Sequence, residues 1–166
     1  AFIMVISFGI QRMSFGTLQI VFWAFAAAMG VSIATIFATF SGESIARVFF
    51  ITAGTFAGMS IWGYTTKRDL TKMGSFLMMG LIGIIIASVV NIFIGCSAIQ
   101  FAVSIIGVVI FTLLTAYDTQ RIKNDYLEYR SHGEAVGKMA IMGAVSLYLD
   151  FVNLFMLLLS LFGNRN

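Results

Sequence analysis

Long runs of apolar residues constrain this chain more than any other feature of its sequence. A helix that crosses the hydrocarbon core of a bilayer needs about 20 mostly apolar residues. Several runs between the charged segments reach that length, and a shorter one stands at the start of the chain. We therefore expect spans near residues 17–41, 45–65, 73–95, 98–117 and 139–162, with a partial helix over 1–10.

The composition excludes a water-soluble globular domain. Of the 166 residues, 60% are hydrophobic and only 10% are charged, whereas soluble domains carry roughly a quarter charged residues. Membrane strands alternate apolar and polar residues, but residues 81–90 form an almost unbroken apolar run. Helices satisfy their own backbone polar groups in lipid. The prediction is an all-α, polytopic transmembrane bundle embedded in the lipid bilayer.

The distribution of basic residues predicts the orientation. Cytoplasmic loops retain Lys and Arg, and the expected spans place most of the ten basic residues on one side. We assign that side to the cytoplasm, with residues 118–138 as its longest loop. The net charge of +3 then follows from topology, so no nucleic-acid partner is expected. The residues on this side are Arg12, Lys67, Arg68, Lys72, Arg121, Lys123, Arg130 and Lys138.

Few side chains suit enzymatic or metal chemistry. Cys96 is the only cysteine, so this chain can form no internal disulfide or cysteine-based metal site. His132, the only histidine, lies in a polar segment where a metal site or a Ser-His-Asp triad would lack partners. No glycine-rich loop carries the Lys-Ser or Lys-Thr pair that cradles phosphate. We expect neither an enzyme nor a bound cofactor.

Two aspartates are the strongest candidates for a functional site, because charges inside a bilayer are costly and face a protein interior or an aqueous cavity. Asp150 lies near the middle of the last span, and Asp118 lies at the cytoplasmic end of the span before it. These spans run antiparallel, so the carboxyls can meet. Two carboxyls in a low-dielectric site cannot both ionise cheaply, so a pair that shares one proton would sense pH.

Other polar residues accompany this pair. The alternative for Asp118 is a local ion pair with Arg121, three residues further along the chain. That alternative leaves Asp150 unexplained. Asn153 follows the second aspartate by three residues, and Asn91 lies in another span. Either could support a pore, or hydrogen-bond a neighbouring helix, and Tyr148 with Asn153 could line a pore mouth. Arg12 is either a distant counter-ion or a topological anchor.

Four segments carry motifs that point to a known family. They read Gly-Tyr-Thr-Thr-Lys-Arg-Asp at 63–69, Met-Gly-Leu-Ile-Gly at 79–83, Ala-Tyr-Asp-Thr-Gln-Arg at 116–121, and a segment at 147–155 that begins Leu-Tyr-Leu-Asp. The Asp-Thr-Gln and Leu-Tyr-Leu-Asp motifs, in that order, are the specific ones. With these motifs the chain resembles the Bax inhibitor motif family over essentially its whole length, and the bacterial branch most strongly.

The resemblance implies a seven-helix fold in which the last helix is central and the other six surround it. The first helix of that fold is absent from this chain. The resemblance also implies a pH-dependent calcium leak, with Asp118 and Asp150 as the family's aspartate dyad. By its position, Arg12 matches the partner arginine that the family carries on its second helix.

Two functional hypotheses follow. The leading one is a calcium or cation leak channel of the bacterial inner membrane, gated by protons at the aspartate pair. Ca²⁺ would pass near Asp118 and Asp150 without a fixed metal site, since it favours oxygen ligands. The alternative is a non-transporting regulator that binds a membrane quality-control protease or another membrane protein.

Overall fold

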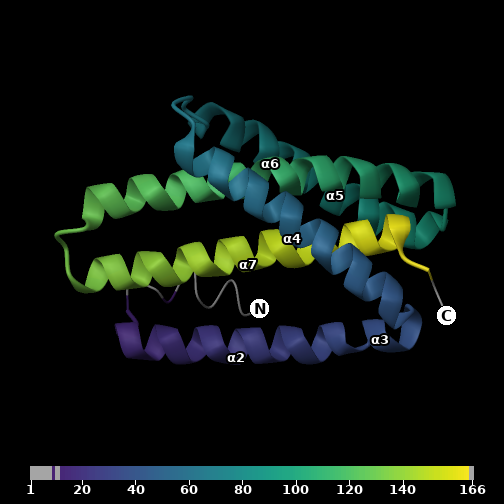
Figure 1. The fold of residues 1–166 in the computed structure, drawn as a ribbon, viewed down its shortest axis with the longest axis horizontal. Coiled ribbons are helices and arrows are strands. Elements are labelled where there is room, and N and C mark those ends of the chain that lie inside the picture. The colour runs from purple at the N-terminus through teal and green to yellow at the C-terminus, as the bar shows by residue number, and fades with distance from the viewer. Residues whose placement is uncertain (1–8, 10–11, 165–166) are drawn as a thin grey trace.

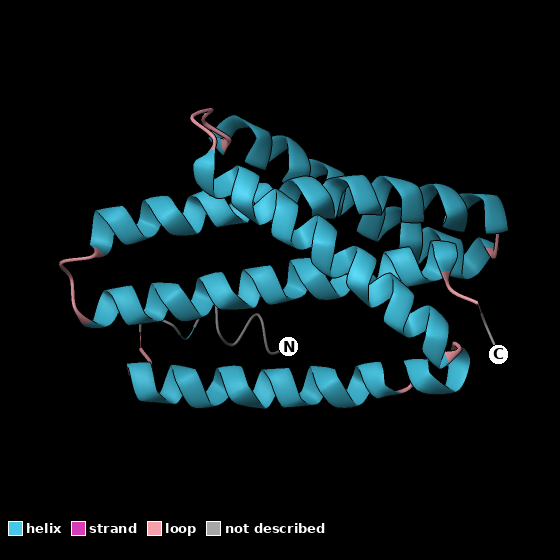
Figure 2. Ribbon diagram, viewed as in Figure 1, coloured by secondary structure: helices cyan, strands magenta, loops and turns pink. Residues whose placement is uncertain are grey.

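The computed structural model describes residue 9 and residues 12–164, so nearly all of the partial helix expected over 1–10 lies outside the described residues. The described part is helical and contains no β-strand, which confirms the all-α prediction. Short loops join the helices (Figure 2). The helices are α2 (Phe15–Ala34), α3 (Ile36–Thr39), α4 (Gly42–Thr65), α5 (Thr71–Ile94), α6 (Ser97–Tyr129) and α7 (Glu134–Phe162), arranged as in Figure 1.

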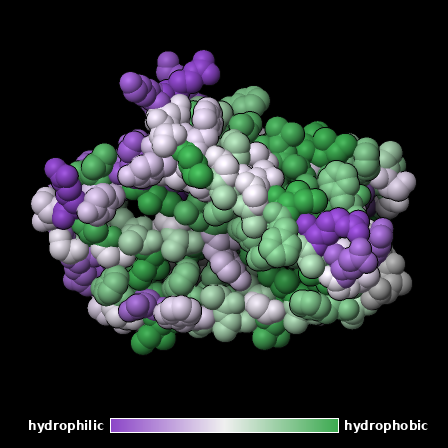
Figure 3. Space-filling view, viewed as in Figure 1, coloured by the Kyte–Doolittle hydropathy of each residue, from purple (hydrophilic) through white to green (hydrophobic). Residues whose placement is uncertain are grey.

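Five helical segments are long and apolar enough to cross a membrane, and they match the five expected spans. The first combines α2 and α3 over Phe15–Thr39. Many large apolar side chains point outward; Phe93, for example, is 86% exposed, and lipid is the solvent that suits such a surface. Hydrophilic residues gather near the α4–α5 loop and the α6–α7 turn, with a smaller patch near the opposite end (Figure 3). The chain is a multi-pass membrane protein.

The main correction concerns the loop predicted over residues 118–138. Helix α6 continues through this segment to Tyr129, and α7 already begins at Glu134, so only residues 130–133 form a turn. Hydropathy marks where a helix leaves the apolar environment, and a helix can continue beyond that point. No glycine or proline interrupts the chain from 118 to 132. Gly133 has φ 51° and ψ −108°, a positive-φ conformation that the turn needs and that glycine adopts more readily than other residues.

Helices α6 and α7 form the core of the described bundle. They run antiparallel and lie side by side, as Figure 1 shows. Helix α6 also contacts α4 and α5, whereas α7 also contacts α2 and α4. One buried cluster joins Leu77 of α5, Leu114 of α6 and Leu154 of α7. The short connections and the antiparallel contacts bring the second half of α6 against the first half of α7.

Small residues allow two close helix contacts. A Cβ added to Gly63 would lie 2.8 Å from the Ala116 Cα, so α4 and α6 touch backbone to backbone there. A Cβ added to Gly107 would lie 2.7 Å from a Leu157 methyl group. The sequence instead suggests a Gly-x-x-x-Gly packing surface at 54 and 58, but both glycines face open space in the described structure.

Candidate functional site

Asp118 lies within a helix rather than at its end, because α6 continues for eleven residues beyond it. The residue is only 7% exposed. Its neighbours along the helix include Thr115 and Thr119, whose hydroxyls donate to backbone carbonyls one turn back. The hydroxyls of these threonines are therefore satisfied within α6. The carboxyl of Asp118 is the polar group here that needs a partner from another helix.

Asp150 supplies that match from the middle of α7. It is 5% exposed, and its carboxyl is close enough to the Asp118 carboxyl for the two groups to interact electrostatically. The Oδ2 atom of Asp150 is buried without a hydrogen-bond partner among the described residues. The two acids that are 32 residues apart in sequence therefore share one poorly solvated position between α6 and α7.

Arg121 is the cation nearest to this pair among the residues that the structure describes. Its Nη2 lies 3.4 Å from Asp118 Oδ1 and donates to Ser146 Oγ at 3.1 Å. The guanidinium also lies 5.9 Å from the centre of the Tyr117 ring. The Arg121 side chain is 43% exposed, so it joins the buried carboxyls to the solvated side. The local ion pair and the contact between the two acids thus coexist.

Arg12 does not take part in the described contacts of the pair. It is exposed in the turn before α2, and within the described residues no ion pair joins it to Asp118 or Asp150. Residues 10 and 11, directly before it, lie outside the described part. The counter-ion role of Arg12 therefore stays a prediction from the family resemblance, whereas Arg121 has the observed contact.

The remaining polar candidates do not surround the acids. Asn153 donates to the Leu149 carbonyl of its own helix at 2.8 Å, so this hydrogen bond stays within α7 and does not join it to a neighbouring helix. Self-bonding one turn back is common for short polar side chains in helices. Tyr148 packs edge-to-face on Phe25 of α2, with ring centres 5.9 Å apart. It thereby helps to hold α2 against α7.

Asn91 stabilises a turn far from the acids. Its Oδ1 accepts the Cys96 N–H at 3.0 Å, and its Nδ2 donates to Gln100 Oε1 at 3.3 Å. Gln100 and Asp118 are separated by about 27 Å along α6, since each helical residue rises about 1.5 Å. Asn91 therefore belongs to the α5–α6 connection and not to the predicted site.

Gln120 is the residue that the sequence prediction missed. It is 8% exposed, and its Oε1 accepts the Leu70 N–H at 2.8 Å while its Nε2 donates to the Arg68 carbonyl at 2.7 Å. These two bonds fasten the α4–α5 loop to α6 two residues beyond Asp118. An amide side chain inside the Asp-Thr-Gln motif was the available signal, because a buried amide needs partners for both its oxygen and its nitrogen.

The α4–α5 loop also has an internal cap. Asp69 Oδ1 accepts the Thr71 hydroxyl at 2.6 Å and the Thr71 N–H at 3.0 Å. These hydrogen bonds, the side-chain one first, lower the pKa of Asp69 below its usual value of 3.8. The carboxylate therefore remains ionised at neutral pH and closes the start of α5.

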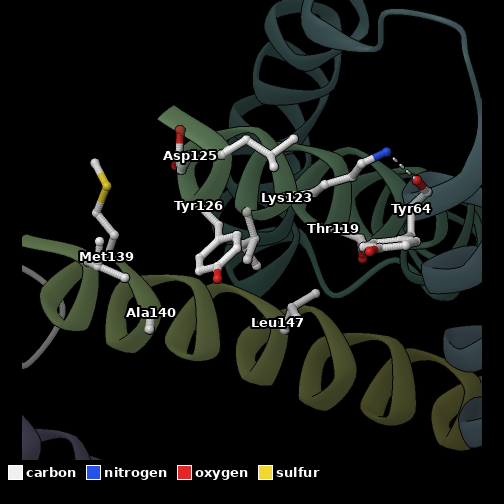
Figure 4. A pocket seen from close by; sticks show the side chains of 11 residues that line it. Tyr64, Thr119, Lys123, Asp125, Tyr126, Met139, Ala140 and Leu147 are labelled. Atoms are coloured by element: carbon white, nitrogen blue, oxygen red, sulfur yellow. Dashed lines mark hydrogen bonds between the residues drawn. The ribbon is translucent and has the colours of Figure 1, made fainter. Parts of the chain in front are cut away.

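Two cavities flank α6 near the acids. A polar one of about 160 Å³ is lined by Thr71, Tyr117, Gln120, Arg121, Asn124 and Asp125. It lies beside Arg121, the residue that forms an ion pair with Asp118. A larger one of about 390 Å³ lies between α6, α7 and the end of α4 (Figure 4).

Comparison with known proteins decides the family. The family model described as inhibitor of apoptosis-promoting Bax1 matches residues 1–166. The chain belongs to the Bax inhibitor family. Among the relatives of this Bax inhibitor chain, an uncharacterised Rickettsia prowazekii protein is 51% identical over 158 residues, which cover 95% of this chain and 66% of that protein.

Two further relatives of this Bax inhibitor chain are named as membrane proteins. The inner membrane protein YbhL of Escherichia coli is 46% identical over 99% of the chain and 71% of its own length. An uncharacterised membrane protein of Streptococcus pyogenes is 36% identical over 88% of the chain and 63% of its own length. The chain therefore spans about two thirds of the length of these relatives.

Proposed function

We propose that this protein is a pH-sensitive calcium leak channel of the bacterial inner membrane, without catalytic chemistry or a bound cofactor. The burial of two neighbouring acids, Asp118 of α6 and Asp150 of α7, between helices that pack on one another carries the proposal. The location is supported by the Escherichia coli relative, which is named an inner membrane protein. The full-length protein then has the seven-helix fold of its family with α7 at the centre, an arrangement consistent with the contacts of α7 with α2, α4 and α6.

The proposed switch uses the proton shared by the two acids. With one proton, a carboxyl and a carboxylate can hydrogen-bond and hold α6 against α7, and Arg121 balances the remaining charge. Loss or gain of a proton replaces this bond with like-charge repulsion or with two neutral acids. Each protonation state therefore favours a different packing of α6 on α7, and the pH sets the populations.

The permeant ion is proposed from the chemistry of the groups on this route. Ca²⁺ favours carboxylate, amide and water oxygens. The polar cavity beside Arg121 presents the side-chain oxygens of Asn124 and Asp125 on the solvated side of the pair. In the proposed route the ion passes from this cavity along the ion pair of Arg121 with Asp118 to the two buried carboxyls, which would act as both gate and passing contact for the ion.

The test is calcium flux through the full-length protein in proteoliposomes between pH 5 and 8. We expect flux that changes with pH in the unaltered protein and a flat response in Asp150→Asn, because the amide fills the same space but does not titrate. Glu128→Gln is the matched control, since Glu128 lies exposed farther along α6. An unchanged pH response in Asp150→Asn would refute the proposed gate.

One observation supports the alternative function, a non-transporting regulator that binds a membrane protease or another membrane protein. The last turns of α6 and the start of α7 form a hairpin with exposed polar residues, among them Glu128, Arg130 and His132. Absence of flux at every pH, together with capture of a membrane protease that depends on residues 124–138, would favour this function over a channel.

A further inference from the structure

The cavity of about 390 Å³ has no role in the proposed gate. Its walls come from the second half of α6, the first half of α7 and Tyr64 near the end of α4. Figure 4 shows α6 and α7 on opposite sides of it, with Tyr126 reaching toward α7. The lining side chains are mainly aliphatic and aromatic: Tyr64, Thr119, Ile122, Lys123, Asp125, Tyr126, Leu127, Val136, Met139, Ala140 and Leu147.

The expected membrane boundary crosses this cavity, because Met139, Ala140 and Leu147 belong to the expected span 139–162, whereas the α6 residues of the lining follow the span that ends at 117. The Phe15 N–H at the start of the α2 span donates to Glu134 Oε1 at the start of α7, at 3.0 Å. The two helices therefore begin at the same depth, and Val136, Met139 and Ala140 lie within the next two turns of α7. An apolar cavity at this depth is within reach of molecules dissolved in the lipid leaflet.

One charged group in the wall lacks an anionic partner. Lys123 Nζ donates to the Tyr64 carbonyl at 2.8 Å and lies 4.9 Å from the centre of the Tyr64 ring. No carboxylate of the described residues forms an ion pair with it. Asp125 lies at the other end of the cavity in Figure 4. An ammonium group has three donors, so two remain for an anion at the Lys123 end.

We propose that this cavity binds a fatty acid from the lipid leaflet, with the carboxylate at Lys123 and the alkyl chain between α6 and α7. A water molecule takes about 30 Å³ in the liquid, and a methylene group is of similar size. The volume therefore suits most of one alkyl chain and is too small for the two chains of a phospholipid. The aliphatic walls supply burial of the chain, and Lys123 selects an anionic head group.

The test uses palmitate with a photoreactive diazirine in its chain, added to the full-length protein in phosphatidylcholine nanodiscs. Labelled peptides are mapped by mass spectrometry. We expect labels on α6 and α7 at the cavity, and unlabelled palmitate should compete about tenfold better than hexadecanol, because the alcohol lacks the charge-assisted bond.

Two pairs of variants distinguish the site for the alkyl chain from the site for the carboxylate head group. Ala140→Phe fills the cavity and should reduce labelling at least fivefold, whereas Ala144→Phe, one turn on at an exposed position outside the lining, should not. Lys123→Met should abolish the preference for palmitate over hexadecanol and retain labelling, whereas Lys72→Met should keep the preference. Thermal melting of each variant verifies that it is folded.

Three results would overturn the proposal. These are labelling spread evenly over the lipid-facing helices, equal competition by acid and alcohol in the unaltered protein, and displacement of the probe by phosphatidylglycerol as efficiently as by palmitate. None of these measurements depends on ion flux, so a failed gate and an empty cavity are distinguishable.

Discussion

Asp150 would be costly in an apolar span if it stood alone, because a buried polar group without a partner loses its hydration. A proton shared with the neighbouring Asp118 would offset that cost, and Arg121 forms an ion pair with Asp118. The position of each acid in its span can be inferred from sequence, because helical rise and antiparallel spans bring the two to similar depth. The three-residue spacing also predicts the ion pair of Asp118 with Arg121, whereas the bond of Arg121 to Ser146 depends on how α6 packs on α7.

A double-mutant cycle measures this dependence of one acid on the other. We expect Asp118→Ala and Asp150→Ala each to destabilise the protein, and their combination to destabilise it by less than the sum, with a coupling of about 0.5–3 kcal/mol. The reason is that either single change leaves the other carboxyl buried without its partner. Thermal unfolding in detergent supplies the values. A cycle of Asp150→Ala with Glu128→Ala is the control and should be additive within about 0.5 kcal/mol.

Helix α6 shows why element boundaries in a membrane protein are only partly readable from sequence. Its apolar residues end near Tyr117, so a hydropathy analysis ends the span there, but the backbone continues as a helix to Tyr129. The glycine pattern is similarly ambiguous. Spacing points to Gly54 and Gly58, whereas the close contact is made at Gly63, where α4 meets Ala116. Which face of a helix meets a neighbour is decided by tertiary packing.

The glycines of α4 provide a direct test of that packing. Gly63→Ala should destabilise the protein by about 1–3 kcal/mol, because the new methyl group overlaps the α6 backbone. Gly58→Ala meets open space and should be neutral or stabilising by up to about 1 kcal/mol through helix propensity. Melting temperatures in one detergent provide the comparison. Equal losses for the two variants would contradict the contact.

For the whole molecule, the fold class and the spans could be predicted because lipid imposes simple requirements of length and apolarity. The orientation rests on the asymmetry of the basic residues. The motif showed an amide at Gln120, but its partners in the α4–α5 loop could not be foreseen, and neither could the larger cavity, which joins residues of three helices. The structure thus adds the contacts between spans to an outline that hydropathy supplies.

The orientation predicts the side from which Cys96 can be labelled. This residue lies in the α5–α6 connection, on the opposite side from the α4–α5 loop. A membrane-impermeant maleimide should therefore react with Cys96 in intact spheroplasts. In a Cys96→Ser background, Lys67→Cys should react only after the membrane is permeabilised. The reverse pattern would invert the assigned topology and place the aspartate pair near the outer surface.

The short turn over residues 130–133 restricts any opening between α6 and α7. Because this turn joins the end of α6 to the start of α7, the two helices cannot slide past one another by a full helical turn unless one of them unwinds. They can part at the acids only by bowing or by rolling about their long axes. After each such opening, the joined helices α6 and α7 return to the same alignment of residues.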